Sequence, residues 1–278
     1  MFLVIPPQIW VERTLAGVPF DSYWQFWGTV FTLVPYPRGN LSWHHLWFLP
    51  YILTFSLGGL PLFVFLRSPS GRAFVERLVR LCARPPGVYL LALPSVAVAF
   101  FLGPRWPVTM NLISDWANLA SSLLSFQFGY VVSSSAHFLA LVERRRHEFL
   151  CVAAGWAVLV FAIRLDSPAR LSGQGRLLAF SVIDSYFAFT MILALVGWSR
   201  ARFNRPSALL RAANEAVYPF YIVHQTVTVL LGYAWLGWIA PFPLKFAALL
   251  AGTFAGSWVF YEAVRRHPLT RVLFGMKA

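Results

Sequence analysis

The sequence predicts an all-α fold, a polytopic transmembrane helical bundle with about seven full spans and a partial one at its N-terminus. Hydrophobic residues make up 58% of the chain, charged residues only 12%, and the mean hydropathy is +0.63. A soluble domain is nearer roughly 45–50% apolar and 25% charged. Long apolar runs recur along the chain, and Lys and Arg gather in every second connection between them. Together these features indicate repeated membrane crossings.

Seven apolar runs are the expected spans. Most approach the roughly 20 residues that a helix needs to cross the hydrocarbon core. The two short runs, 87–102 and 149–163, need flanking residues or local bilayer thinning. We treat residues 1–278 as a single membrane domain. Its expected spans are Leu46–Leu66, Gly87–Leu102, Leu119–Val142, Phe149–Ile163, Leu177–Trp198, Ala216–Trp238 and Leu244–Val264.

The distribution of basic residues predicts the orientation. Segments 67–84, 143–148, 199–213 and 265–278 hold sixteen Lys and Arg, whereas the alternate connections 103–118, 164–176 and 239–245 hold five. Basic connections stay in the cytoplasm. We therefore expect a cytoplasmic C-terminus and a location in a bacterial inner membrane.

Three further segments have expected places. Residues 1–10 resemble the outer half of a span, and residues 11–43, rich in Trp and Pro, are expected as an outer-face loop. Residues 67–84 are expected as a cytoplasmic basic loop. Within it, Phe74–Leu81 is amphipathic and predicts a short helix along the inner surface.

Composition and motifs exclude several functions. The net charge of +13 sits in short clusters between apolar runs, which suits an anionic membrane surface and not nucleic acid. Cys82 and Cys151 are too few for a disulfide framework and too isolated for a metal site. The sequence contains no GxSxG, Walker or HExxH motif. We therefore expect no metal and no bound cofactor.

Ionisable groups inside spans are costly and are candidates for function. His224 lies near the middle of the sixth span, beside Gln225 and one turn after Tyr221. An imidazole is suited to take a proton from a hydroxyl near neutral pH, and the neighbours suit orienting a substrate. A structural hydrogen bond within the bundle is the alternative. Asp184, in the fifth span, is either functional or paired with a cation of another span.

The other candidates have stronger structural alternatives. His137 follows a serine run near the inner end of the third span, where a hydrogen bond to a neighbouring helix accounts for it. Glu262 stands close to Arg265 at the membrane edge, so an ion pair competes with a functional role. His44 opens the first span and reads as a hydrated interfacial residue.

Four stretches carry a resemblance to a known family. HLWFLPYILTFSL (His45–Leu57) resembles the HLWFL signature of the integral-membrane acyltransferase family 3, most closely its glucan biosynthesis protein C branch. YPFYIVHQTVTVLLGY (Tyr218–Tyr233) is similar to that branch's tyrosine-rich helix with a mid-span histidine. FYEAVRRHPLTRVLFGMK (Phe260–Lys277) and IPPQIWVERTLAG (Ile5–Gly17) resemble its closing segment and the outer end of a span.

The resemblance implies transfer of an acyl group, succinyl or acetyl, from acyl-CoA as co-substrate to a sugar hydroxyl of a periplasmic glucan or other cell-surface glycan. His45 and Trp47 match the signature, His224 the histidine helix, and Tyr261 and Glu262 the terminal motif. We expect His224 to act as a base or a substrate-orienting group, with Asp184 as its polar partner. Binding to substrate is expected of His45, Trp47, Gln225, Tyr221 and Glu262.

The sequence departs from the family pattern at its N-terminus. The family's first two spans, with a histidine taken as catalytic and an arginine-rich loop, have no counterpart. We therefore expect a shortened chain, arising from a late start codon, a fragment or a degenerate copy.

Two other functions remain open. A glycan or lipid transporter would also place polar groups in mid-membrane, and an inactive scaffold would keep the fold alone. For the enzyme, Arg144 and Arg145 are expected to attract the phosphates of CoA, with solvated positive-inside loops as the alternative. The partners expected are the lipid bilayer, acyl-CoA and a glycan acceptor, and the oligomeric state stays open.

Overall fold

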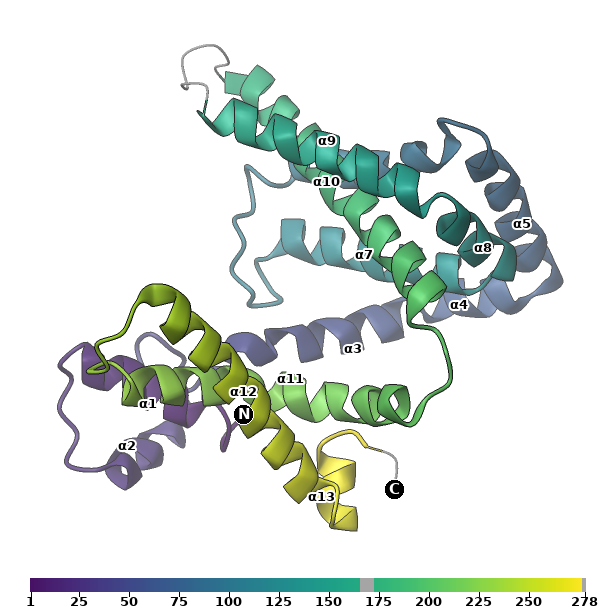
Figure 1. The fold of residues 1–278 in the computed structure, drawn as a ribbon. Helices are drawn as coiled ribbons and strands as arrows, with labels where there is room; N and C mark the ends of the chain where they lie inside the picture. The colour runs from purple at the N-terminus through teal and green to yellow at the C-terminus, as the bar shows by residue number, and fades with distance from the viewer. Residues whose placement is uncertain (166–172, 277–278) are drawn as a thin grey trace. The chain divides into compact units, whose positions relative to one another are not determined.

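The computed structural model describes residues 1–165 and 173–276, and 76% of these residues are helical. Within the described residues the only β-type pairing is an isolated bridge between Pro35 and Leu41, so the all-α prediction is confirmed. Residues 166–172 of the expected outer connection and Lys277 of the basic tail lie outside the described residues. The chain forms two compact units (Figure 1). That residues 1–278 form one domain stays a prediction.

The first unit joins the two ends of the chain, residues 1–48 and 206–278. The long helices α11 and α12 pack side by side in it, and α1 packs against α11. Segment 11–43 contains the end of α1 and all of α2, so part of the expected loop is helical; its placement at an outer face stays a prediction. The helices are α1 (Pro6–Leu15), α2 (Tyr23–Val30), η1 (His44–Trp47), α11 (Ala208–Ala234), α12 (Phe242–Val264) and α13 (Pro268–Leu273).

The second unit comprises residues 49–205. Its two longest helices, α9 and α10, run side by side (Figure 1). Its helices are α3 (Phe48–Gly58), α4 (Leu60–Arg67), α5 (Pro69–Ala83), η2 (Gly87–Ala92), α6 (Leu93–Phe101), α7 (Trp116–Ser133), α8 (Ala136–Arg144), α9 (Arg146–Leu165) and α10 (Gly173–Arg202).

Several helices suit a membrane by length and composition. Among the described residues, α10 and α12 are each long and apolar enough to cross, and two bent helix pairs would raise the number to four. The first pair bends by 50° between Gly58 and Leu60, where Gly and a following Pro61 interrupt the helix. The second bends by 118° at Pro85 and Pro86. The described residues therefore hold two to four candidate membrane spans, and the count of about seven stays a prediction.

One expected span is broken in two. The run Leu119–Val142 was expected to be continuous, but α7 ends at Ser133 and α8 begins at Ala136. The intervening serine hydroxyls compete with the helical backbone for hydrogen bonds. Ser134 Oγ donates to the Val131 carbonyl (2.7 Å), and Ser135 Oγ caps α8 by accepting from the Phe138 amide (3.3 Å). The serine run that looked like part of a span is a helix boundary.

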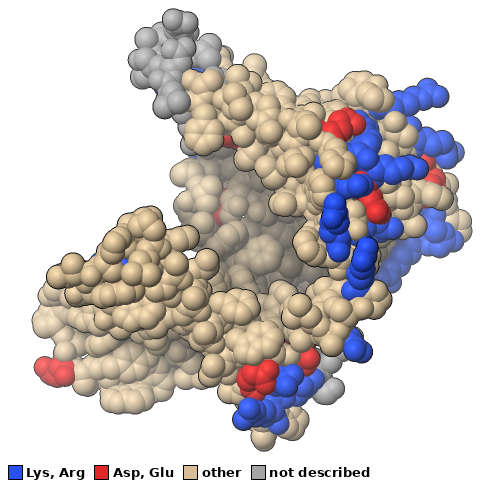
Figure 2. All heavy atoms as spheres, viewed as in Figure 1, with Lys and Arg blue, Asp and Glu red and all other residues tan. Residues whose placement is uncertain are grey.

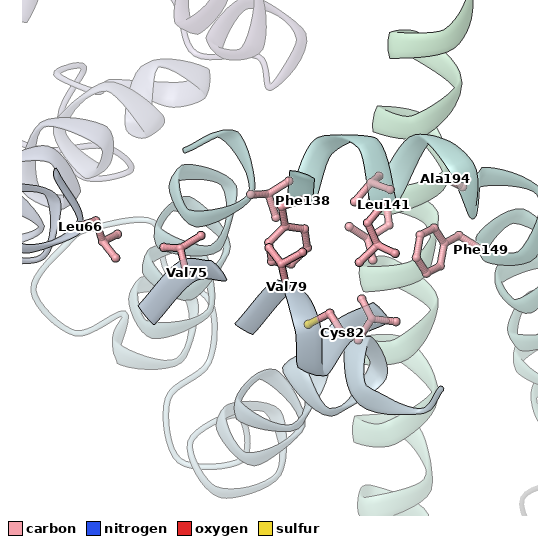
Figure 3. Packing of buried hydrophobic residues seen from close by; sticks show 12 residues of the cluster. Leu66, Val75, Val79, Cys82, Phe138, Leu141, Phe149 and Ala194 are labelled. Atoms are coloured by element: carbon pink, nitrogen blue, oxygen red, sulfur yellow. The ribbon is translucent and has the colours of Figure 1, made fainter. Parts of the chain in front are cut away.

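The core of the second unit forms around α5. Val75, Val79 and Cys82 recur at helical spacing and are buried, whereas Arg77 and Arg80 on the other face are exposed. Figure 3 shows this apolar edge of α5 packed against residues of α8, α9 and α10. The amphipathic helix expected over Phe74–Leu81 is thus present but longer, and it occupies most of the segment 67–84 expected as a loop.

The basic connections of the second unit lie together. Figure 2 shows its Lys and Arg gathered at the end that carries α5 and α8, and the remaining visible surface nearly free of them. Arg145 Nη1 donates to the Cys82 carbonyl (2.9 Å), and Arg200 pairs with Glu143 at 2.8 Å. These two contacts join segments 67–84, 143–148 and 199–213, which all carry the basic bias.

A buried carboxylate organises the loop before α7. Asp115 is 1% exposed and accepts hydrogen bonds from the Thr109 and Met110 amides (2.9 and 3.0 Å) and from the Tyr51 hydroxyl (2.5 Å). A further bond comes from the Asn118 side chain (2.8 Å). Burial alone would raise the pKa of Asp115, but these donors favour the charged form and lower it below its usual range.

The hydrogen bonds to Asp115 predict how its substitution changes the stability of the fold. Asp115→Asn removes the charge that the donors satisfy, so we expect the free energy of unfolding to fall by about 2–4 kcal/mol at pH 7. Because the folded-state pKa is lowered, the carboxylate stabilises the fold above its ordinary pKa of about 3.9 and loses this effect as the pH falls through the folded-state value. Unfolding in detergent micelles, followed by circular dichroism, measures the change.

Asp21→Asn is the matched control, because Asp21 is exposed and its side chain accepts only from Gln25 among the bonds described. A variant at Asp115 that unfolds like wild type and like this control would contradict the account.

Candidate active site

Helix α11 of the first unit carries His224, the histidine that the sequence singled out. Ser207 caps its start by accepting from the Leu210 amide at 3.0 Å. Pro219 lies inside the helix and removes one backbone donor five residues before His224. The Thr228 and Thr253 hydroxyls, 2.9 Å apart, join α11 to α12. His224 is therefore held on a helix that packs on both sides, against α1 and α12.

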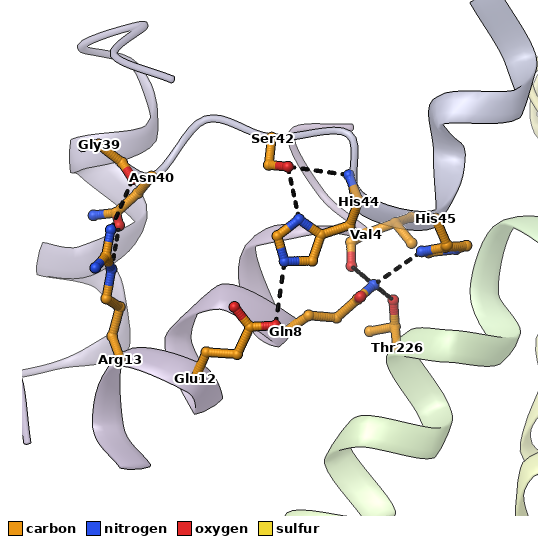
Figure 4. A network of polar contacts seen from close by, with 10 residues as sticks. All are labelled: Val4, Gln8, Glu12, Arg13, Gly39, Asn40, Ser42, His44, His45 and Thr226. Atoms are coloured by element: carbon orange, nitrogen blue, oxygen red, sulfur yellow. Dashed lines mark hydrogen bonds and ion pairs between the residues drawn. The ribbon is translucent and has the colours of Figure 1, made fainter. Parts of the chain in front are cut away.

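A fully buried amide ties α1 to α11 next to this histidine. The side chain of Gln8 is 0% exposed, and its Nε2 donates to Thr226 Oγ1 at 2.7 Å (Figure 4). The Thr226 hydroxyl in turn donates to the Val4 carbonyl at 2.7 Å. Gln8 Nε2 also lies 3.5 Å from His45 Nδ1. One glutamine thus connects α1, η1 and α11.

His45 is fixed at both ring nitrogens. Its Nε2 lies 2.9 Å from the Ile222 carbonyl of α11, and since a carbonyl only accepts, Nε2 carries the hydrogen. Nδ1 is then the lone-pair nitrogen and faces the N–H of Gln8. The Tyr221 hydroxyl also donates to the His45 backbone carbonyl at 2.5 Å. The expected binding residues His45 and Tyr221 are brought together.

His224 adopts the opposite arrangement. Its Nδ1 lies 2.9 Å from the Tyr221 carbonyl and 3.1 Å from the Phe220 carbonyl, so Nδ1 is the donor. Nε2 is therefore the basic nitrogen of the neutral ring. The ring packs edge-on against that of His45, with centroids 5.3 Å apart. Since His224 is only partly buried, its Nε2 is suited to take a proton from a bound group.

One acceptor of the network lacks a partner. Gln8 Oε1 is buried and has no hydrogen-bond partner among the described residues. A buried carbonyl oxygen without a donor costs free energy of about 1–3 kcal/mol. A ligand that brings a hydroxyl or an N–H to this oxygen would remove that cost.

The three other predicted site residues of the first unit lie on α11, η1 and α12. Gln225 is partly buried on α11 next to His224. Trp47 ends η1 and packs edge-on against Phe48, with ring centroids 5.9 Å apart. Glu262, on α12, forms an ion pair with Arg265 at 2.9 Å, which is the structural alternative raised from the sequence.

Three predicted residues belong to the second unit. Asp184 is exposed on α10. Arg145 is held by Glu148, with its Nε 2.8 Å from Oε2, and by the Cys82 carbonyl, whereas the Arg144 side chain is exposed. The hydrogen bond to Arg145 lowers the pKa of the Glu148 carboxyl. Of the two arginines, Arg144 is the more accessible to an anion.

Gln8 and Thr226 were not singled out by the sequence. A usable signal was the pair Gln8 and Glu12, which stand four residues apart on the otherwise apolar start of α1 and so share one face. Polar residues at this spacing in an apolar helix indicate a buried partner. No group of three His, Cys, Asp or Glu side chains suited to a metal occurs in the part of the chain that the structure describes.

The hydrogen-bond pattern predicts opposite neutral tautomers for the two histidines: Nε2–H in His45 and Nδ1–H in His224. Nitrogen-15 NMR of the protein labelled at histidine distinguishes the two forms by the shifts of the ring nitrogens. His45→Gln and His224→Gln assign the signals. If His224 carried its hydrogen on Nε2, the basic nitrogen proposed at this site would not exist.

The comparisons with known proteins give the family. The family model of acyltransferase family 3, described as an acyltransferase domain, matches residues 10–262. No curated protein and no solved structure matches the chain. The matched residues include His45 and His224, all of the second unit and most of the first. The chain therefore belongs to acyltransferase family 3, and is a membrane protein of that family.

Proposed function

We propose that the protein is a membrane O-acyltransferase that moves an acyl group, succinyl or acetyl, from acyl-CoA to a sugar hydroxyl of a periplasmic glucan or another cell-surface glycan. The observation that carries the proposal is the His45–His224 pair, with Nε2 of His224 as the basic nitrogen beside a fixed second imidazole. Family membership supports the reaction class.

The chemistry requires a base, because an alcohol is a poor nucleophile until its proton is removed. His224 Nε2 takes the proton of the acceptor hydroxyl, and the resulting oxygen attacks the carbonyl carbon of the acyl group. The bond from that carbon to the group that carries the acyl breaks, and the leaving group recovers a proton, so that over the whole reaction the acyl group passes from the CoA sulfur to the acceptor oxygen. Gln8 Oε1, His45, Tyr221 and Gln225 are the groups available to hold the acceptor. Asp184 of the second unit remains a proposed catalytic residue, and Trp47 and Glu262 remain proposed substrate contacts.

The donor side of the proposal depends on charge. Arg144 and the exposed arginines Arg77, Arg80 and Arg84 are suited to attract the phosphates of CoA at the basic end of the second unit. The joining of three basic segments at this end supports the positive-inside orientation. The proposed topology has about seven spans, a cytoplasmic C-terminus and a place in a bacterial inner membrane.

A transporter of glycans or lipids is the second candidate. The unpartnered carbonyl of Gln8 would also suit a passing polyol. A transporter needs no base, however, whereas His224 presents a basic nitrogen. Covalent labelling of the glycan separates the two functions.

Substitution of His224 tests the proposal. His224→Ala is expected to lower acyl transfer by about 10²–10⁴-fold, the usual contribution of a general base. Membranes containing the full chain are supplied with radiolabelled succinyl-CoA or acetyl-CoA, and label is followed into the glycan fraction.

His137→Ala is the matched control, since this histidine is exposed in the second unit and pairs with Glu76 at 3.0 Å. Transfer that survives in His224→Ala at the control's rate would rule out the proposed base.

A further inference from the structure

A serine, a histidine and a carboxylate form a continuous hydrogen-bonded chain one helical turn from the site. Ser42 Oγ lies 2.6 Å from His44 Nδ1, and His44 Nε2 lies 3.3 Å from Glu12 Oε1 (Figure 4). Glu12 follows Gln8 by four residues on α1, and His44 precedes His45. His44 and His45, which are neighbours in the sequence, thus contact Glu12 and Gln8 on successive turns of α1.

The hydrogen positions in this chain follow from its donors. The Glu12 carboxylate only accepts, so His44 Nε2, which faces it, carries the ring hydrogen. Nδ1 is then the lone-pair nitrogen, and the Ser42 hydroxyl donates to it while Ser42 Oγ accepts from the His44 backbone N–H at 3.1 Å. This is the order hydroxyl, imidazole base, carboxylate that activates serine nucleophiles, with the two ring nitrogens exchanged.

The surrounding loop holds this geometry in place. The backbone of His44 has φ 39°, a left-handed conformation that costs about 1–3 kcal/mol in a residue other than glycine. Its side chain is only 12% exposed and packs edge-on against Tyr36, with ring centroids 5.4 Å apart. Arg13 fastens the loop through the Pro37 and Gly39 carbonyls at 2.6 and 2.9 Å. Burial and the Glu12 carboxylate together raise the pKa of Tyr36, so it stays protonated beside the chain.

A turn-forming role explains only part of this arrangement. The bond from the His44 amide to Ser42 Oγ is sufficient to close the turn before η1. It does not require the ring of His44 to bridge from the hydroxyl to a carboxylate on another helix. That bridge is what activation of a nucleophile requires.

We propose that Ser42 is a nucleophile that carries the acyl group as an ester between donor and acceptor. This deepens the proposed acyl transfer and rests on it for the identity of the donor, an acyl thioester. In the first step Ser42 Oγ attacks the thioester carbonyl, and its proton passes to His44 Nδ1. The carbon–sulfur bond breaks, and the thiolate leaves and takes a proton from water. Glu12 stabilises the imidazolium of His44.

The second step regenerates the serine. The acceptor hydroxyl loses its proton to His224 Nε2, and its oxygen attacks the ester carbonyl. The bond between the acyl carbon and Ser42 Oγ breaks, and Ser42 Oγ recovers its proton from His44. His224 releases its proton to water. Ser42, His44 and His224 touch the reacting atoms, whereas Glu12 acts through His44 as a positioning residue.

The nucleophile can be tested without any acyl donor. The purified full chain is treated with a biotin-linked fluorophosphonate, which reacts with activated serines, and the adduct is located by mass spectrometry. We expect labelling at Ser42 and its loss in Ser42→Ala. Ser22→Ala is the matched control, because Ser22 also closes a turn, through the Gln25 amide, and the described contacts give it no histidine. Absence of an adduct on Ser42 of the wild type would overturn the proposal.

The role of Glu12 is tested by the labelling rate of Glu12→Gln, which separates an electrostatic role of the carboxylate from a purely structural hydrogen bond. Glu12→Gln keeps an oxygen acceptor for His44 but removes the charge, so a merely structural role predicts an unchanged labelling rate. A charge that stabilises the imidazolium predicts a fall of roughly 10²-fold or more. Equal rates for wild type and Glu12→Gln would contradict the role of Glu12.

The last experiment measures transfer of the acyl group itself, first to Ser42 and then to the glycan. Radiolabelled acyl-CoA without acceptor should leave label on Ser42, and Ser42→Cys should carry it as a thioester that neutral hydroxylamine releases. Transfer to glycan at the wild-type rate in Ser42→Ala would overturn the relay and leave the proposed function standing. An adduct on Ser42 without any transfer by the wild type would support the nucleophile and count against the proposed function. The cysteine variant keeps the test decisive even where Ser42→Ala unfolds.

Discussion

Burying an amide inside an apolar helical unit forces the helices around it into fixed positions. Gln8 is completely buried, and its N–H groups must find acceptors, because an unsatisfied donor in a low-dielectric interior costs about 1–3 kcal/mol. Thr226 supplies one acceptor from α11, and His45 presents its Nδ1 from η1 at a longer distance. The bond from Thr226 to the Val4 carbonyl then fixes the start of the chain as well. Segments more than two hundred residues apart in the sequence are thereby held in one layer of the first unit.

This layer explains why the two imidazoles differ. His45 uses both ring nitrogens within the protein, toward Ile222 and Gln8, so the role proposed for it is to position neighbouring groups and not to exchange a proton. His224 uses only Nδ1 within its own helix. The two imidazoles, with ring centroids 5.3 Å apart, therefore differ in whether a ring nitrogen is left without a hydrogen bond inside the described protein. The difference comes from which backbone carbonyl each ring meets.

The sequence predicted the helical class and the candidate histidines from local information. Apolar runs located α10 and α12 closely, because both helices are long and apolar, and the run Ala216–Trp238 covered most of α11 but missed its polar start. The family signature pointed to His45 and the polar position within α11 to His224. Both inferences need only neighbours along the chain. The role of His224 as a base remains a prediction.

The contacts that the sequence did not give are those that depend on tertiary structure. Ser134 and Ser135 end a helix inside an apolar run, because their hydroxyls capture backbone groups. Gln8 and Glu12 acquire meaning only when α1 lies against η1 and α11. His44 read as a hydrated interfacial residue, yet its side chain is 12% exposed and joined to Ser42 and Glu12. A hydrogen bond across more than thirty residues leaves no periodic pattern to detect.

The claim that His45 and His224 form one functional unit has a direct test in a double-mutant cycle for acyl transfer. The specificity constant is measured for wild type, His45→Ala, His224→Ala and the double variant in matched membranes. Residues that act together are strongly non-additive. We predict that the double variant is no slower than the worse single variant, within about threefold. Losses that multiply would mean that the two histidines act independently, and the account of a single site would be wrong.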